Sequence, residues 1–180
     1  MQKISVKKII LTAMFIALTF AATMVIRIPT GNGYVNLGDC VVLMSGFLLG
    51  PYYGALAAGI GSALADLIGY PIYAPATFII KAIVALLAGL IFKISKKRST
   101  VWVVICGIIG EAFMVLGYYV VEAFILGLGW EVAMVSVPSN IFQGIAGIAT
   151  SSILIQIFMQ RNNSKSRQND DEYGEDNENE

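Results

Sequence analysis

The segment from Val35 to Lys81 is strongly apolar, yet it contains Asp39, Asp66 and Lys81. An ionisable side chain placed in lipid costs about 2.5–3.5 kcal/mol on insertion scales. Chains retain such groups where they face one another, a water-filled cavity or a ligand. The segment therefore predicts a membrane protein that encloses a polar site.

The composition of the whole chain agrees with a membrane location. Of the 180 residues, 57% are hydrophobic and 13% are charged, with a mean hydropathy of +0.73, whereas soluble domains carry about 25% charged residues. A helix needs roughly 17–25 apolar residues to span the hydrocarbon. The sequence predicts an all-α integral membrane protein, a compact bundle of six transmembrane helices at about residues 9–26, 38–49, 52–69, 76–92, 101–127 and 133–159.

A continuous helix over residues 41–65 would reduce the number of spans to five. Gly50-Pro51 argues against it, because proline breaks the helical hydrogen bonding and restricts the residue before it. Basic residues in short loops mark the cytoplasmic side. Six spans place all three basic clusters on that side, whereas five would put the middle one outside; the clusters are Lys3, Lys7 and Lys8, then Lys93, Lys96, Lys97 and Arg98, then Arg161, Lys165 and Arg167. Both termini are then cytoplasmic, and residues 27–34, 70–75 and 126–131 form external loops.

The chain is predicted to be one membrane domain, residues 1–160, followed by a polar tail, residues 161–180. The tail lacks the apolar residues needed to form a core, so we expect it to be disordered. With no histidine, and with two cysteines predicted near opposite membrane faces, we expect no metal site, no disulfide and no enzyme. There is no GxxxxGK[ST] motif, so any ATP must be used by partner subunits. We expect no cofactor in this chain and no nucleic-acid partner.

The fifth predicted helix has the clearest periodicity. Glu111, Val115, Tyr118 and Glu122 fall at positions i, i+4, i+7 and i+11, which lie on one helical stripe. Exposing two carboxyl groups to lipid would be costly, so the stripe should face the bundle interior. There it forms either a ligand site or a pair of carboxyls hydrogen-bonded to neighbouring helices.

Further polar residues fall in the outer half of the last three predicted helices. Lys81 lies about one turn inside the fourth helix, for which Thr77 is predicted as the N-cap. Its ammonium either snorkels to the surface, contacts a ligand, or pairs with Asp39, Asp66 or Glu122. In the sixth helix, Asn140, Gln143 and Gly147 share a face. The two amides suit recognition of a polar heterocycle and equally suit contacts between helices.

The first predicted helix carries Ala13, Ala17 and Ala21 at four-residue spacing. Small residues at this interval either admit a closely packed partner helix or pack inside the protein. The first external loop is rich in glycine and asparagine and carries Tyr34. We expect it to cover an outward-facing pocket with aromatic walls and few polar anchors, the usual form of a small-molecule site.

Residues 35–89 resemble the substrate-binding S components of energy-coupling factor (ECF) vitamin transporters, in particular the riboflavin-transporter-like group. The resemblance rests on the series LGD…GPYYGA…AD…P-T-IIKA, the short second helix and the basic connection between the fourth and fifth helices. It implies a multi-pass protein of a bacterial cell membrane that captures a vitamin from outside. It also implies assembly with two cytoplasmic ATPases and with a membrane T component, and Ala13, Ala17 and Ala21 would dock onto the T component.

The resemblance also places the ligand site by its location in the family. It implies a pocket beneath the first external loop, walled by the last three helices, with the binding residues Tyr34, Asn36, Lys81, Glu111, Tyr118, Glu122, Asn140 and Gln143. Asp39 and Asp66 are either structural or part of this site. Riboflavin is the substrate favoured by the resemblance, followed by pyridoxine or a thiamine-related pyrimidine. The alternative is a proton-coupled small secondary transporter that uses Glu111 and Glu122.

Overall fold

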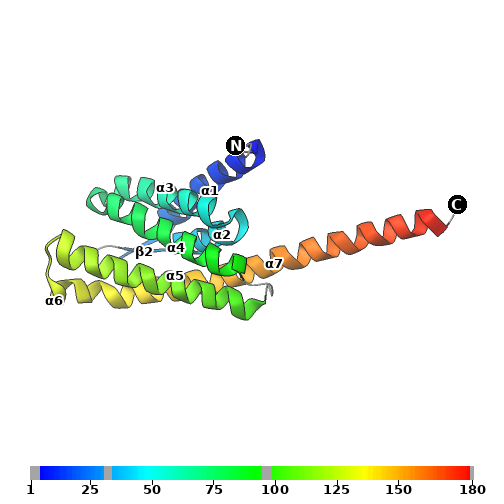
Figure 1. The fold of residues 1–180 in the computed structure, drawn as a ribbon. Coiled ribbons are helices and arrows are strands. Elements are labelled where there is room, and N and C mark those ends of the chain that lie inside the picture. The colour runs from blue at the N-terminus through cyan, green and yellow to red at the C-terminus, as the bar shows by residue number, and fades with distance from the viewer. Residues whose placement is uncertain (1–4, 31–33, 95–98, 179–180) are drawn as a thin grey trace.

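The computed structural model describes residues 5–30, 34–94 and 99–178, with side chains as far as Arg161. Its helices run in the order α1 (Val6–Val25), α2 (Gly38–Leu49), α3 (Pro51–Gly69), α4 (Ala74–Ile94), α5 (Thr100–Val120), the four-residue α6 (Trp130–Ala133) and α7 (Val137–Glu178). Short turns of 3-10 helix precede α4 (Pro71–Tyr73) and α7 (Met134–Ser136). Apart from the short α6, the described part of the chain has six helices of 12 residues or more, as the apolar segments predict. Figure 1 shows how these helices pack into a bundle.

Four of the described helical segments are long and apolar enough to cross a membrane. They are Val6–Val25, Pro71–Ile94, Thr100–Ile125 and Trp130–Arg161. Helix α2 is apolar but has only 12 residues, and α3 has 19 residues rich in glycine and alanine. The protein is therefore a multi-pass membrane protein in which two of the six helices differ from simple spans.

The break between α2 and α3 occurs at Gly50. This residue has φ +83°, a left-handed conformation that glycine adopts without steric cost, and Pro51 then begins α3. The two helices fold back on each other and pack closely against α4. A Cβ atom on Gly46 would lie 2.5 Å from the carbonyl oxygen of Ala85, and one on Gly54 would lie 2.6 Å from that of Ser45. Small residues thus bring three backbones together, as expected for helices packing in lipid.

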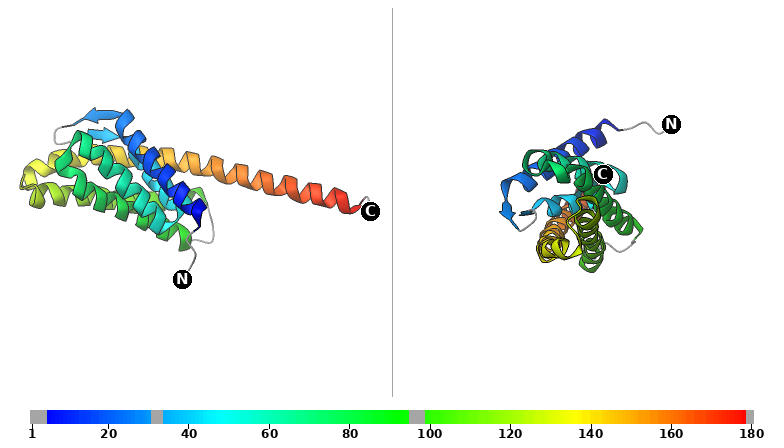
Figure 2. Two further views of the ribbon diagram at one scale, coloured as in Figure 1. Left: turned by 90° about the horizontal axis from the view of Figure 1, so that it is seen from above. Right: turned by 90° about the vertical axis from the view of Figure 1, so that its left-hand side faces the viewer.

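The centre of the bundle is formed by large apolar side chains of α2, α4, α5 and α7. Leu43, Val84, Met114 and Ile155 are almost completely buried there. Helix α1 differs, because only Thr19 and Thr23 among its residues are buried. Figure 2 shows α1 lying across the outside of the bundle.

The connection between α1 and α2, predicted to be a loop, forms a small antiparallel hairpin. Strand β1 (Arg27–Pro29) pairs with β2 (Tyr34–Asn36), with Arg27 opposite Asn36 and Pro29 opposite Tyr34. The hairpin lies at the end of the bundle opposite the basic ends of the helices. It places Tyr34 and Asn36 over the polar interior.

Helix α7 extends well beyond the bundle. Residues 161–178 continue α7 as a helix that projects away from the bundle (Figure 1). Their composition supplies no apolar face. The disorder of the tail and the domain limit at residue 160 stay predictions. The basic residues Lys3, Lys96, Lys97 and Arg98 lie outside the described residues.

Candidate functional site

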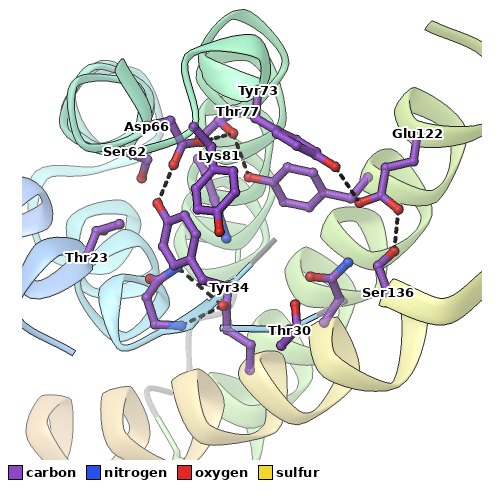
Figure 3. Close-up of a pocket in the computed structure, with 15 residues that line it drawn as sticks. Thr23, Thr30, Tyr34, Ser62, Asp66, Tyr73, Thr77, Lys81, Glu122 and Ser136 are labelled. Atoms are coloured by element: carbon purple, nitrogen blue, oxygen red, sulfur yellow. Dashed lines mark hydrogen bonds between the residues drawn. The ribbon is translucent and has the colours of Figure 1, made fainter. Parts of the chain in front are cut away.

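A cavity opens beneath the hairpin, between α3, α4, α5 and α7 (Figure 3). The empty space among its side chains is about 580 Å³, including solvent at the mouth, and about 60 Å³ of it admits the centre of a water molecule. The cavity is therefore partly filled by its own side chains. Seven of the eight residues expected at the ligand site line it: Tyr34, Asn36, Lys81, Tyr118, Glu122, Asn140 and Gln143.

The floor of the cavity contains a buried ion pair. The Lys81 ammonium donates to Asp39 Oδ1, and both residues are nearly inaccessible, at 3% and 1% exposed. Gln143 Nε2 donates to the other Asp39 oxygen at 2.6 Å, and the Lys81 nitrogen also lies 2.8 Å from the sulfur of Met114. Snorkelling of Lys81 to the surface is thus wrong, and pairing with Asp39 is confirmed. The pair links α2 to α4 and, through Gln143, to α7.

Gln143 also fastens the hairpin to α7. Its Oε1 accepts from the backbone N–H of Asn36 at 2.8 Å and from the Asn36 side chain at 3.2 Å. The Asn36 Oδ1 in turn accepts from the backbone N–H of Gly38 at 2.8 Å, at the start of α2. These amides therefore serve as contacts between elements, and each still borders the cavity.

Asp66 collects a second group of hydrogen bonds under the hairpin. The Tyr34 hydroxyl donates to Asp66 Oδ1, and the Thr77 hydroxyl donates to Oδ2 at 2.5 Å. The Tyr118 hydroxyl lies 2.9 Å from the Thr77 oxygen. Because the Thr77 hydrogen is used by Asp66, the Thr77 oxygen accepts the hydrogen bond from Tyr118. Burial raises the pKa of Tyr34, and the neighbouring Asp66 raises it further. Arg27 lies over the Tyr34 ring at 4.6 Å.

Glu122 lies on the opposite side of the cavity from Asp66 in Figure 3. It is 3% exposed, accepts from the Ser136 hydroxyl at 2.5 Å and lies 3.4 Å from the Tyr73 hydroxyl. Glu122 belongs to a turn of π-helix, Val121–Ile125, that continues α5. Such turns are frequent at functional sites. The interior position expected for Glu122 is confirmed.

Glu111 is the one expected site residue that does not line the cavity. It is 3% exposed, and neither of its carboxyl oxygens has a hydrogen-bond partner in the described part of the chain. Its side chain packs against Gly144 of α7, where a Cβ would lie 3.0 Å from the Cβ of Glu111. The predicted interior location is confirmed, but Glu111 does not itself border the cavity.

Eight further residues line the cavity, and of these the sequence points only to Asp66, as either structural or part of the site. Most are hydroxyl-bearing side chains, which are common in membrane helices and give little signal on their own; they are Thr23, Thr30, Ser62, Asp66, Tyr70, Tyr73, Thr77 and Ser136. A usable signal was the tyrosine pair in the second external loop. Tyr70 stacks on Tyr34 with ring centroids 5.4 Å apart and meets Tyr73 edge to face at 6.4 Å.

The charges and rings of the wall define what the cavity can accept. Asp66 and Glu122 offer carboxylate oxygens, while the Lys81 charge is neutralised by Asp39. Four tyrosines supply flat apolar surface beside hydroxyl groups. Among the described residues, no three His, Cys, Asp or Glu side chains are grouped so as to hold a metal ion. The site suits a neutral, flat ligand with several hydrogen-bonding groups.

The three alanines of the first helix lie outside the cavity. Ala13, Ala17 and Ala21 are all exposed on α1, on the side away from the buried Thr19 and Thr23. They therefore do not pack inside the described bundle, and the stripe is open to lipid or to another helix.

A family model for the "ECF-type riboflavin transporter, S component" matches residues 3–160 of this chain. The chain belongs to this family. It is therefore a transport subunit and not an enzyme, as the motifs of residues 35–89 indicated. Membership favours the binding subunit over the proton-coupled transporter considered as an alternative.

One sequence relative and two solved structures are similar to this chain, and the two structures share its fold. An "uncharacterized protein in gap 3'region" of Pyrococcus woesei is 37% identical over 142 residues, covering 77% of this chain and 93% of that protein. A solved S component of a bacterial ECF transporter is similar with a TM-score of 0.67 at 23% identity, covering 86% of this chain and 96% of that one. The S component for biotin from an ECF-type ABC transporter gives 0.63 at 20%, covering 84% and 92%.

Proposed function

We propose that this chain captures riboflavin from the external side in the cavity beneath the hairpin. The proposal rests on one observation, namely a cavity of aromatic rings and hydrogen-bonding groups in a chain of the riboflavin-type family. Riboflavin is uncharged at neutral pH and combines a flat three-ring system with a chain of hydroxyl groups. The neutralised Lys81 and the carboxylates Asp66 and Glu122 suit such a ligand better than an anionic one.

The positions of the side chains suggest how the two parts of riboflavin are bound. Tyr34, Tyr70 and Tyr73 surround one side of the cavity and offer ring faces for stacking. Glu122 with Ser136, together with Asn140, offers acceptors and donors for hydroxyl or ring amide groups. Tyr118 and Lys81 lie deeper, and Asn36 and Gln143 close the cavity between the hairpin and α7.

We propose further that a membrane T component and two cytoplasmic ATPases complete the importer. The description of the family as the S component of a transporter supports this proposal, because it denotes one component of a larger assembly. ATP would be used by the partner subunits. The exposed stripe of Ala13, Ala17 and Ala21 is the proposed contact with the T component, because its small side chains let a second helix approach closely.

Quenching of riboflavin fluorescence by the detergent-purified protein tests the ligand and the site. Glu122→Ala and Asn140→Ala each remove a polar partner from a buried site, so each should weaken binding by about 1–3 kcal/mol, or about 5- to 150-fold in Kd. Glu131→Ala and Ser139→Ala are matched controls, because neither residue lines the cavity. Unchanged affinity in both cavity variants would move the site elsewhere.

Two further outcomes separate the parts of the proposal. Saturable binding of pyridoxine or a thiamine-related pyrimidine, with no binding of riboflavin, would keep the binding subunit and change its cargo. Uptake in cells that survives loss of the ATPases and stops when the proton gradient is dissipated would favour the secondary transporter that uses Glu111 and Glu122.

A further inference from the structure

A second hollow is lined by residues of α2, α4, α5 and α7. It lies at the other end of the bundle, where α2 and α4 end, α5 begins and α7 leaves the bundle. We call it the inner groove. Its empty space is about 1050 Å³, including open solvent, which is larger than that of the cavity beneath the hairpin. The residues that line it include none of those proposed to bind riboflavin.

The inner groove is lined by apolar and polar side chains in similar measure, and its accessible apolar side chains are Leu48, Phe158 and Met159. Phe47 and Phe92 form a tilted aromatic pair with ring centroids 4.9 Å apart, and Ile155 of α7 is 1% exposed beside them. Ser99 at the start of α5 and Gln160 on α7 belong to the lining as well. Phe158 is 54% exposed, so the groove presents apolar surface that an acyl chain can cover.

Basic residues accompany the groove at the same end. Lys93 directly follows Phe92, and Arg161 directly follows Gln160; both basic side chains are exposed. This is the end that carries the basic clusters and is cytoplasmic by the positive-inside rule. The cytoplasmic leaflet is the one rich in anionic lipids, which basic pockets between transmembrane helices bind through their head groups.

We propose that the inner groove is a binding site for one anionic phospholipid of the cytoplasmic leaflet. An acyl chain lies against the accessible side chains Leu48, Phe158 and Met159, and the phosphate is held near Lys93 and Arg161. The apolar wall explains the chain, and the positive charge at the mouth selects an anionic head group over a zwitterionic one. The site is independent of riboflavin, because it shares no residue with the cavity beneath the hairpin.

Native mass spectrometry of the full chain, titrated with palmitoyl-oleoyl phosphatidylglycerol or phosphatidylcholine, tests the head group. We expect one saturable phosphatidylglycerol adduct of higher affinity than any phosphatidylcholine adduct. In Lys93→Gln/Arg161→Gln, affinity should fall by about fivefold for each charge removed, from about 1 kcal/mol per basic residue. Lys7→Gln/Lys8→Gln makes the same change of charge on α1 and should bind as the wild type does. Equal binding of the two lipids, or equal losses in the two double variants, would overturn the proposal.

A groove-filling variant tests the chain position. Thr100 lines the groove and its neighbour Val101 does not, although it is 66% exposed. Thr100→Trp should therefore reduce phosphatidylglycerol binding at least tenfold, whereas Val101→Trp should not, and riboflavin binding reports that both variants are folded. If Thr100→Trp blocks assembly with the T component but leaves lipid binding unchanged, the groove binds a partner protein. That result would overturn the lipid site.

Discussion

Replacing Lys81 by methionine should destabilise the protein strongly, because it leaves Asp39 as an unpaired charge in the bundle interior. Lys81 and Asp39 are 3% and 1% exposed, so water cannot screen the loss. Removing one partner of a buried pair costs about 3–5 kcal/mol. For a protein of this size each kcal/mol lowers Tm by about 2–4 °C, which gives a fall of about 6–20 °C.

The double variant distinguishes loss of the ion pair from loss of packing. In Lys81→Met/Asp39→Asn no charge remains, and Gln143 can still hydrogen-bond the amide, so the double variant should be more stable than the sum of the single changes by at least about 1 kcal/mol. Unfolding in detergent, followed by intrinsic fluorescence, measures all three variants. Lys7→Met, at an exposed lysine, should stay within about 0.5 kcal/mol of the wild type. Additive single effects, or a stable Lys81→Met protein, would refute the reasoning.

Three further predictions follow from other contacts. Ala17→Leu should abolish co-purification with the T component and uptake, with riboflavin affinity unchanged; Ala112→Leu, at another exposed alanine, should do neither. Tyr34 has a raised pKa in the folded state, so its contribution is complete below its unfolded pKa of about 10 and is lost as pH rises above it. Tm measured from pH 8 to 11 should therefore fall less steeply in Tyr34→Phe, and an identical slope would contradict this. Gly46→Ala should cost about 1–3 kcal/mol by overpacking, since the added methyl group meets backbone of α4 at 2.5 Å; an unchanged Tm would contradict this.

The helices could be predicted because lipid imposes simple rules on composition and length. Gly50-Pro51 separates α2 from α3 where the sequence indicated, and the predicted start of the second helix at residue 38 is confirmed. The predicted start of the fourth helix, at about residue 76, was wrong, because the 3-10 turn Pro71–Tyr73 leads directly into a helix from Ala74. Thr77 is therefore not an N-cap, and its hydroxyl instead donates to Asp66.

The contacts of the site were less predictable than its location. Periodicity correctly placed Glu111 and Glu122 inside the bundle, but it cannot tell a side chain that borders a cavity from one packed against a neighbouring helix, as Glu111 is against Gly144. The choice of Asp39 as the partner of Lys81 depends on how α2 crosses α4. Sequence spacing within each helix carries no information on such a crossing. From the sequence alone, Asp39, Asp66 and Glu122 therefore remain candidate partners of Lys81.

The shortness of α2 has a consequence for how the fold can change its cargo. Twelve helical residues cover about 18 Å, whereas the hydrocarbon is about 30 Å thick. The hairpin precedes α2 and borders the cavity through Tyr34 and Asn36, and non-helical backbone near the membrane is tolerated when it is enclosed by protein or borders a water-filled cavity. The short helix and the hairpin above it thus leave room for a hollow whether or not a ligand is present. Natural selection can therefore exchange the side chains around it for a new nutrient without having to invent the space.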